Sequence, residues 1–78
     1  MNRRSFETTL RTLARSAPFR PFVVELVSGS RIRVDHPEAI AFNVGVAVHI
    51  AQDGTPTIFD ADGVAQVIAR QDKSKRSA

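Results

Sequence analysis

The sequence predicts an α+β domain in which an N-terminal helix precedes a small, mostly antiparallel five-stranded barrel, partly open and SH3-like or Sm-like. Three observations support this prediction. Apolar residues first recur every three or four positions, then alternate with period two from Phe22 onward, and 78 residues are too few for a second core. A sheet this small must curl or close to protect its edges, so a barrel is the economical architecture.

The helix is expected over about residues 5–16, with Ser5 as its N-cap. Pro18 and Pro21 end it, because proline lacks an N–H and biases the preceding residue toward extended backbone. The apolar positions trace one face of this helix, and they are Phe6, Leu10, Leu13, Ala14 and Ala17. We expect the helix to cover one open end of the barrel.

A β-hairpin follows, because apolar residues alternate on both sides of a Ser-Gly-Ser break at residues 28–30. A two-residue loop would place Arg33 opposite Val24 and mix charge into the apolar face. A three-residue loop, residues 27–29, with Gly29 in the left-handed conformation, removes that conflict. It pairs Val24 with Ile32 and Phe22 with Val34, and it sets Glu25 opposite Arg31.

The remaining chain is divided by turn residues. Pro37 interrupts the hairpin and favours a short helical turn through about Ala41. A strand is expected over 44–51, with valines and Ile50 on one face and small residues on the other, and a short strand over 57–59. Residues 64–70 fit a short helix or a strand, and their β-branched residues favour the strand. The domain therefore spans 1–70, with its sheet within 20–70, and 71–78 form a disordered basic tail.

The net charge of +3 is unevenly distributed. Residues 1–20 carry five arginines against Glu7, a net charge of +4, and residues 71–78 carry a net charge of +2. Residues 21–70 carry three arginines against six carboxylates, a net charge of −3. The predicted sheet is therefore acidic, and the basic residues lie at the two ends.

Three short motifs carry a resemblance. They are Pro-Phe-Arg-Pro-Phe at residues 18–22, the hairpin glycine Gly29, and His-Pro-Glu at 36–38. In this combination the chain resembles a set of short uncharacterised bacterial proteins with a leading helix. The resemblance covers about residues 5–50. It implies a small bacterial domain without an assigned activity, and it supplies no catalytic residue.

The polar residues at the end of the hairpin have two interpretations. His36 and Glu38, beside Asp35, could bind a metal or act in acid–base chemistry. We favour a structural role in which both fasten the corner through bonds to backbone groups freed where the strand stops. We interpret His49 as an outward-facing or groove-lining residue, because two histidines without other clustered donors make a poor zinc site.

No motif for covalent catalysis, phosphate binding or a cofactor is present, so we expect a non-catalytic protein without cofactor, metal or small-molecule substrate. Asp60 and Asp62 resemble a fragment of a calcium loop but lack its downstream glutamate, and a turn and capping role is the better interpretation. The absence of cysteine fits a reducing cytoplasm. The sequence contains no apolar run long enough for a membrane span or a signal peptide.

Two functions remain open. The first is an interaction module that binds a protein partner or itself through an exposed strand edge at residues 44–51. The second is binding of RNA or single-stranded nucleic acid, in an Sm-like manner, through the basic helix and tail. Its candidate contacts are Arg3, Arg4, Arg11, Arg15, Lys73, Lys75 and Arg76.

Overall fold

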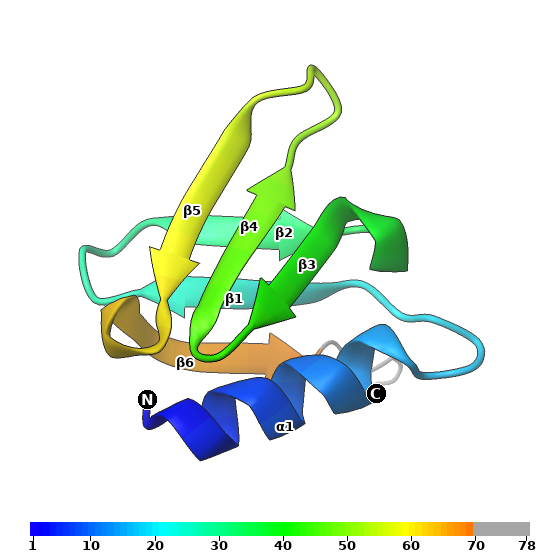
Figure 1. The fold of residues 1–78 in the computed structure, drawn as a ribbon. Helices are drawn as coiled ribbons and strands as arrows, with labels where there is room; N and C mark the ends of the chain where they lie inside the picture. The colour runs from blue at the N-terminus through cyan, green and yellow to red at the C-terminus, as the bar shows by residue number, and fades with distance from the viewer. Residues whose placement is uncertain (70–78) are drawn as a thin grey trace, which may run out of the picture.

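The computed structural model describes residues 1–69 and contains one helix and six strands in two antiparallel sheets. The α+β prediction is confirmed, whereas the prediction of one five-stranded barrel is not, because neither sheet closes (Figure 1). The first sheet has the strand order β2-β1-β6 and the second β3-β4-β5. The elements are α1 (Arg3–Ala14), β1 (Phe22–Leu26), β2 (Arg31–Val34), η1 (Pro37–Ala39), β3 (Ile40–Asn43), β4 (Val46–Ile50), β5 (Pro56–Asp60), η2 (Ala61–Gly63) and β6 (Val64–Ala69).

The helix starts two residues earlier than expected. Its N-cap is Asn2, whose side-chain oxygen accepts a hydrogen bond from the backbone N–H of Ser5 at 2.8 Å. Ser5 therefore lies inside the first turn and is not the cap. An asparagine at this position satisfies one of the N–H groups that a helix leaves without an intrahelical acceptor.

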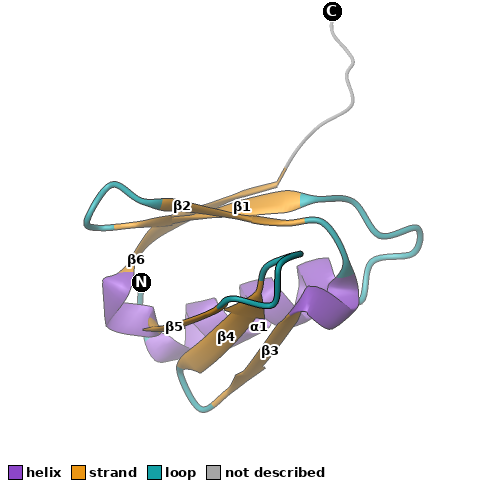
Figure 2. Ribbon diagram, turned by 90° about the horizontal axis from the view of Figure 1, so that it is seen from above, coloured by secondary structure: helices purple, strands orange, loops and turns teal. Residues whose placement is uncertain are grey.

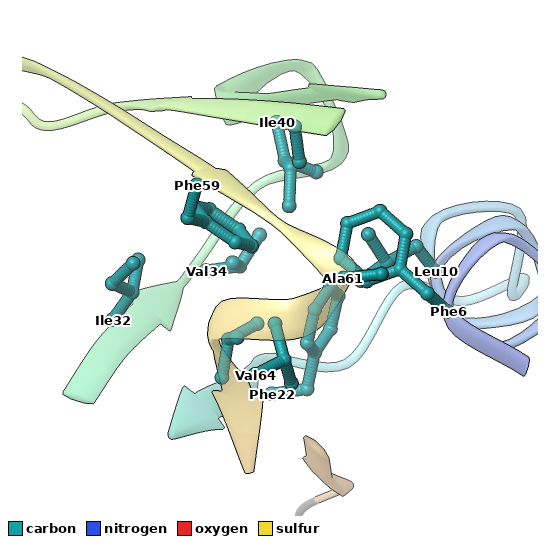
Figure 3. Packing of buried hydrophobic residues seen from close by; sticks show 11 residues of the cluster. Phe6, Leu10, Phe22, Ile32, Val34, Ile40, Phe59, Ala61 and Val64 are labelled. Atoms are coloured by element: carbon teal, nitrogen blue, oxygen red, sulfur yellow. The ribbon is translucent and has the colours of Figure 1, made fainter. Parts of the chain in front are cut away.

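The two sheets form separate layers, and α1 runs along one side of the space between them (Figure 2). Phe6 and Leu10 are fully buried, and the ring of Phe6 meets that of Phe59 edge-on, with 6.2 Å between centroids. From the first sheet, Phe22, Val24 and Val34 are equally buried. Figure 3 shows Phe22 and Val34 within this cluster. Phe19 packs against this core, with its ring centroid 6.0 Å from that of Phe22. The helix thus completes one core shared by both sheets.

The first hairpin has the predicted register. Phe22 pairs with Val34, Val24 with Ile32, and Glu25 with Arg31. Leu26 donates its N–H to the carbonyl of Ser30 at 2.8 Å, which leaves a three-residue loop, and Gly29 in that loop has a φ of +97°. A residue with a Cβ is strained at that angle, so glycine fixes the loop length and the register follows.

The chain between the two sheets differs from the expected course. The 3₁₀ turn at Pro37–Ala39 agrees with the expected helical turn but is shorter, and residues 40–43 form strand β3. A two-residue turn then joins β3 to β4, with φ of +48° at Val44 and +81° at Gly45. Positive φ at both positions is the pattern of a type I′ hairpin turn. Val44 therefore belongs to a turn and not to the strand in which the alternation placed it.

Residues 64–69 form a strand, as favoured over the helix, and β6 pairs antiparallel with β1. The turn η2 before it is held by the N-terminus, because the Met1 ammonium donates to the carbonyls of Ala61 at 3.2 Å and Val64 at 3.0 Å. The predicted tail at 71–78 lies outside the described residues. Within residues 1–69, no helix is long and apolar enough to cross a membrane.

The outer face of the first sheet is polar at its centre. Glu25 accepts a hydrogen bond from the Gln66 side chain on β6, and its carboxylate lies 3.4 Å from the Arg31 guanidinium on β2. The hydrogen bond from Gln66 is the largest cause that holds the pKa of Glu25 below its ordinary value, and the charge of Arg31 acts in the same direction. These contacts connect all three strands of this sheet.

We expect Phe6→Ala to destabilise the domain by about 3–5 kcal/mol, because it leaves a cavity where the helix meets both sheets. Urea unfolding followed by circular dichroism measures this loss. The control Val27→Ala changes a 70% exposed side chain at the hairpin tip, and its effect should stay within about 0.5 kcal/mol. Equal losses in the two variants would contradict the placement of Phe6.

We expect Gln66→Ala to raise the pKa of Glu25 toward its ordinary value, because the variant removes the largest cause of the lowering. The lowered pKa stabilises the fold above the unfolded-state pKa, and this contribution is lost as the pH falls through the folded-state pKa. An NMR titration of the Glu25 side chain, with Gln52→Ala as control, measures the change. An unchanged Glu25 pKa in the Gln66 variant would contradict the assignment.

Candidate interaction surface

The outer face of the second sheet carries an apolar surface that no described helix or strand covers (Figure 1). We call it the β3–β4–β5 face. Val46, Ile50 and Ile58 are 48%, 43% and 72% exposed, which is unusual for large β-branched residues in the strands of so small a domain. The full β3–β4–β5 face consists of Ala41 and Asn43 on β3, Val46, Val48 and Ile50 on β4, and Pro56, Ile58 and Asp60 on β5.

The alternation of β4 points its one small residue, Ala47, inward. Ala47 is 2% exposed and faces the core, whereas Val46 and Val48 lie on the opposite face. The pairing explains this orientation, because Ala47 lies between Phe42 and Phe59 in one row across the sheet. Phe59 is buried and Phe42 packs partly buried against the core, so the small side chain of Ala47 lies between two large rings. The valines of β4 are consequently directed to solvent.

The β3–β4–β5 face is uneven in height as well as apolar. In one row across the sheet, Ala41 pairs with Val48 and Val48 with Ile58, so a small residue and a large residue stand at opposite edges. An open hollow of about 350 Å³ lies on this face. Ala41, Asn43, Val46, Val48 and Ile58 contribute to its lining.

The strand edge expected at 44–51 is not an edge. Strand β4 pairs with β3 on one side and with β5 on the other, so its backbone groups are used within the sheet. The edges of this sheet are β3 and β5, and β5 begins with Pro56, which has no N–H to offer to an added strand. The exposed feature of β4 is its side-chain face.

His36 and His49 line a common groove of about 290 Å³, together with Arg33 and Asp35. The groove-lining interpretation of His49 agrees with this position. Arg33 is bound to Asp35, with 2.6 Å between its Nε and the carboxylate. Glu38 does not line the groove, so the structure brings the two histidines together but not all three predicted residues.

The corner at residues 36–39 is closed by the backbone. The N–H of Ala39 donates to the carbonyl of His36 at 3.0 Å, and the His36 side chain makes no capping hydrogen bond. At the second 3₁₀ turn the capping prediction is confirmed, because the Asp60 carboxylate accepts from the N–H of Gly63 at 3.0 Å. Among residues 1–69, no three His, Cys, Asp or Glu side chains gather in a way that could hold a metal ion.

The arginines of the helix divide into two groups. Arg4, Arg11 and Arg15 are exposed and, at spacings of seven and four, share one side of the helix. Arg3 is turned away from them and lies against Gly45, so closely that a Cβ at position 45 would be 3.1 Å from the Arg3 Cγ. Arg3 also lines a cleft of about 440 Å³ with Asp60 and Asp62. Lys73, Lys75 and Arg76 lie outside the described residues.

The sequence did not single out the outward-facing residues of the second sheet, above all Ile58, as candidates for binding. A signal was present, because valine or isoleucine at 46, 48 and 50 alternates with small residues at 45, 47 and 51. The pattern identifies two faces but not which one is inward. In the folded protein, the face of β4 that lies beside the phenylalanines of the neighbouring strands is the inward one.

Comparison with protein-family models, with curated proteins and with solved structures found no match to this chain.

Proposed function

We propose that this protein is a non-catalytic interaction module of the cytoplasm that binds a protein surface through the β3–β4–β5 face. The observation that carries the proposal is the exposure of Val46, Ile50 and Ile58 side by side on one sheet. Contiguous exposed apolar side chains of this kind mark interaction sites on small domains. A strand edge, the site first expected, is a weaker candidate because β4 is already paired on both sides.

The other sheet supports this choice by contrast. Its outer face carries Arg31, Glu25 and Gln66 in one row, linked by an ion pair and a hydrogen bond. Such a face is well solvated and has no need of a partner. The next row of this face contains the partly buried Val23 and Ile68 beside the exposed Arg33. The two outer faces therefore differ in their central row, which is charged and hydrogen-bonded on the first sheet and apolar on the second.

We further propose that the fold is an open relative of the small SH3-like or Sm-like barrels. Two 3₁₀ turns support this proposal, because η1 carries the chain from β2 to β3 and η2 carries it from β5 to β6. Both connections lead from one sheet to the other, as corners of a barrel do.

We expect Ile58→Asp to abolish binding of the protein partner, because it places a charge at the most exposed large apolar residue of the face. Tagged wild-type and variant proteins are used to capture partners from a lysate to which the untagged wild-type chain has been added, followed by mass spectrometry. The tag is placed after residue 78, because the Met1 ammonium is bonded to η2.

Val27→Asp is the matched control for this experiment, since Val27 is 70% exposed and Ile58 is 72% exposed. Val27 lies at the tip of the first hairpin, outside the β3–β4–β5 face. A partner that is retained by the Val27 variant and lost by the Ile58 variant supports the proposal. Equal capture by both variants would overturn it.

A second candidate function rests on the helix. Arg4, Arg11 and Arg15 form no ion pair with any other residue in the range 1–69, so their charges are available to phosphates. All five phenylalanines are buried or half-buried, which leaves no aromatic platform for bases among the described residues. Binding of nucleic acid would therefore depend on phosphates and be independent of base sequence.

If the helix binds single-stranded RNA, we expect Arg11→Ala/Arg15→Ala to lower the slope of log K against log salt by about 1.4, or about 0.7 for each lost contact. Fluorescence anisotropy with a labelled oligonucleotide measures this slope. Arg31→Ala/Arg33→Ala removes the same charge from another surface and should leave the slope unchanged. Equal slopes in the two double variants would exclude a contact through the helix.

A further inference from the structure

We propose that the occupant of the β3–β4–β5 face is a second copy of this chain, stacked face to face about a two-fold axis that runs parallel to β4. This inference rests on the proposed function and names its partner. Two sheets that stack in this way keep their strands nearly aligned. A closed two-fold dimer uses the same surface on both copies, so the face must be complementary to itself.

The register of the sheet permits a direct test of self-complementarity. A two-fold axis along β4 keeps each row across the sheet at its own level and exchanges the two edges. In the central row, Ile58 of one copy then lies over Ala41 of the other, and Val48 lies over Val48. The large side chain at one edge meets the hollow beside the small residue at the other, and this contact occurs twice.

The polar residues of the face are also matched by this axis. The next row contains Asn43, Val46 and Asp60, of which Asp60 alone is charged. The exchange of edges places Asp60 over Asn43 of the second copy, whose carboxamide can donate a hydrogen bond to the carboxylate. At the same end, Val46 meets Val46. The dimer therefore leaves no buried carboxylate without a donor.

The alternative two-fold axis, perpendicular to the strands, fits poorly. It would stack Ile58 on Ile58 and Ala41 on Ala41, which crowds one edge and leaves the hollow at the other edge empty. It would also reverse the order of the rows, so that Asp60 would face Pro56, which has no donor to offer. Size and charge therefore select the axis along β4.

The size of the face sets the strength of the dimer. Three strands about 4.8 Å apart and five residues with a rise of about 3.3 Å give a footprint of roughly 14 by 16 Å. This is well below the roughly 800 Å² that each partner contributes to a standard specific interface, so we expect a weak, transient dimer that forms at high micromolar to millimolar concentration.

The experiment exchanges the large and the small residue between the two edges. Sedimentation equilibrium over a range of concentrations should give a dimer for the wild-type chain. Ile58→Ala and Ala41→Ile should each raise the dissociation constant at least about tenfold, one by loss of apolar contact and the other by crowding. The double variant Ile58→Ala/Ala41→Ile should recover most of the affinity, because each contact again joins one large and one small residue.

Urea unfolding of the same variants shows whether each monomer is folded, and Val27→Ala serves as a control that keeps the dimer. Recovery in the double variant supports the dimer and its axis. Additive losses in the double variant, or a monomer at all concentrations, would overturn the inference. If the chain is monomeric but Ile58→Asp still loses a partner that Val27→Asp retains, the occupant is another protein and the proposed function stands. If the chain is monomeric and the two variants capture the same partners, both the dimer and the proposed function are overturned.

Discussion

The burial of Phe6 and Leu10 between the two sheets is the contact on which the rest of the structure depends. Each sheet has only three strands, and together they leave one side of the core open (Figure 2). The helix fills that side with two fully buried side chains, one of which meets Phe59 edge-on. Among the described residues, the inner faces of both sheets and the buried side of the helix together form this single core.

The chemistry of the two outer faces follows from how the core is filled. On the inner side of the second sheet, Ala47 lies between the phenylalanines of β3 and β5, and the alternation of β4 turns its valines outward. In the first sheet the aliphatic residues Val24 and Ile32 are inward, so the charged residues of β1 and β2 are outward. The central row of the outer face is thus charged on the first sheet and apolar on the second.

The sequence allowed the first hairpin to be predicted in register, because Gly29 and the requirement that charge stay out of the apolar face both select the same loop. It did not allow the hairpin formed by β3 and β4 to be predicted. That turn places Val44 at a φ of +48°, a conformation that β-branched residues rarely adopt, so no local signal marks it. The inward face of β4 was equally inaccessible, because it depends on Phe42 and Phe59, which neighbour Ala47 only after folding. The helix cap was misplaced by three residues because Ser5 and Asn2 are both good caps.

The two surfaces that could carry function are separated by the same packing. The side of α1 that faces the core carries Phe6 and Leu10, so Arg4, Arg11 and Arg15 lie on its solvent side, along the flank of the domain. The apolar surface lies on the broad face of the second sheet (Figure 1). A second copy stacked on that face would cover valines and isoleucines but would leave the flank with its arginines open. Association would then bring two basic flanks into one particle and double the number of phosphates within reach, so dimer formation and phosphate binding would reinforce each other.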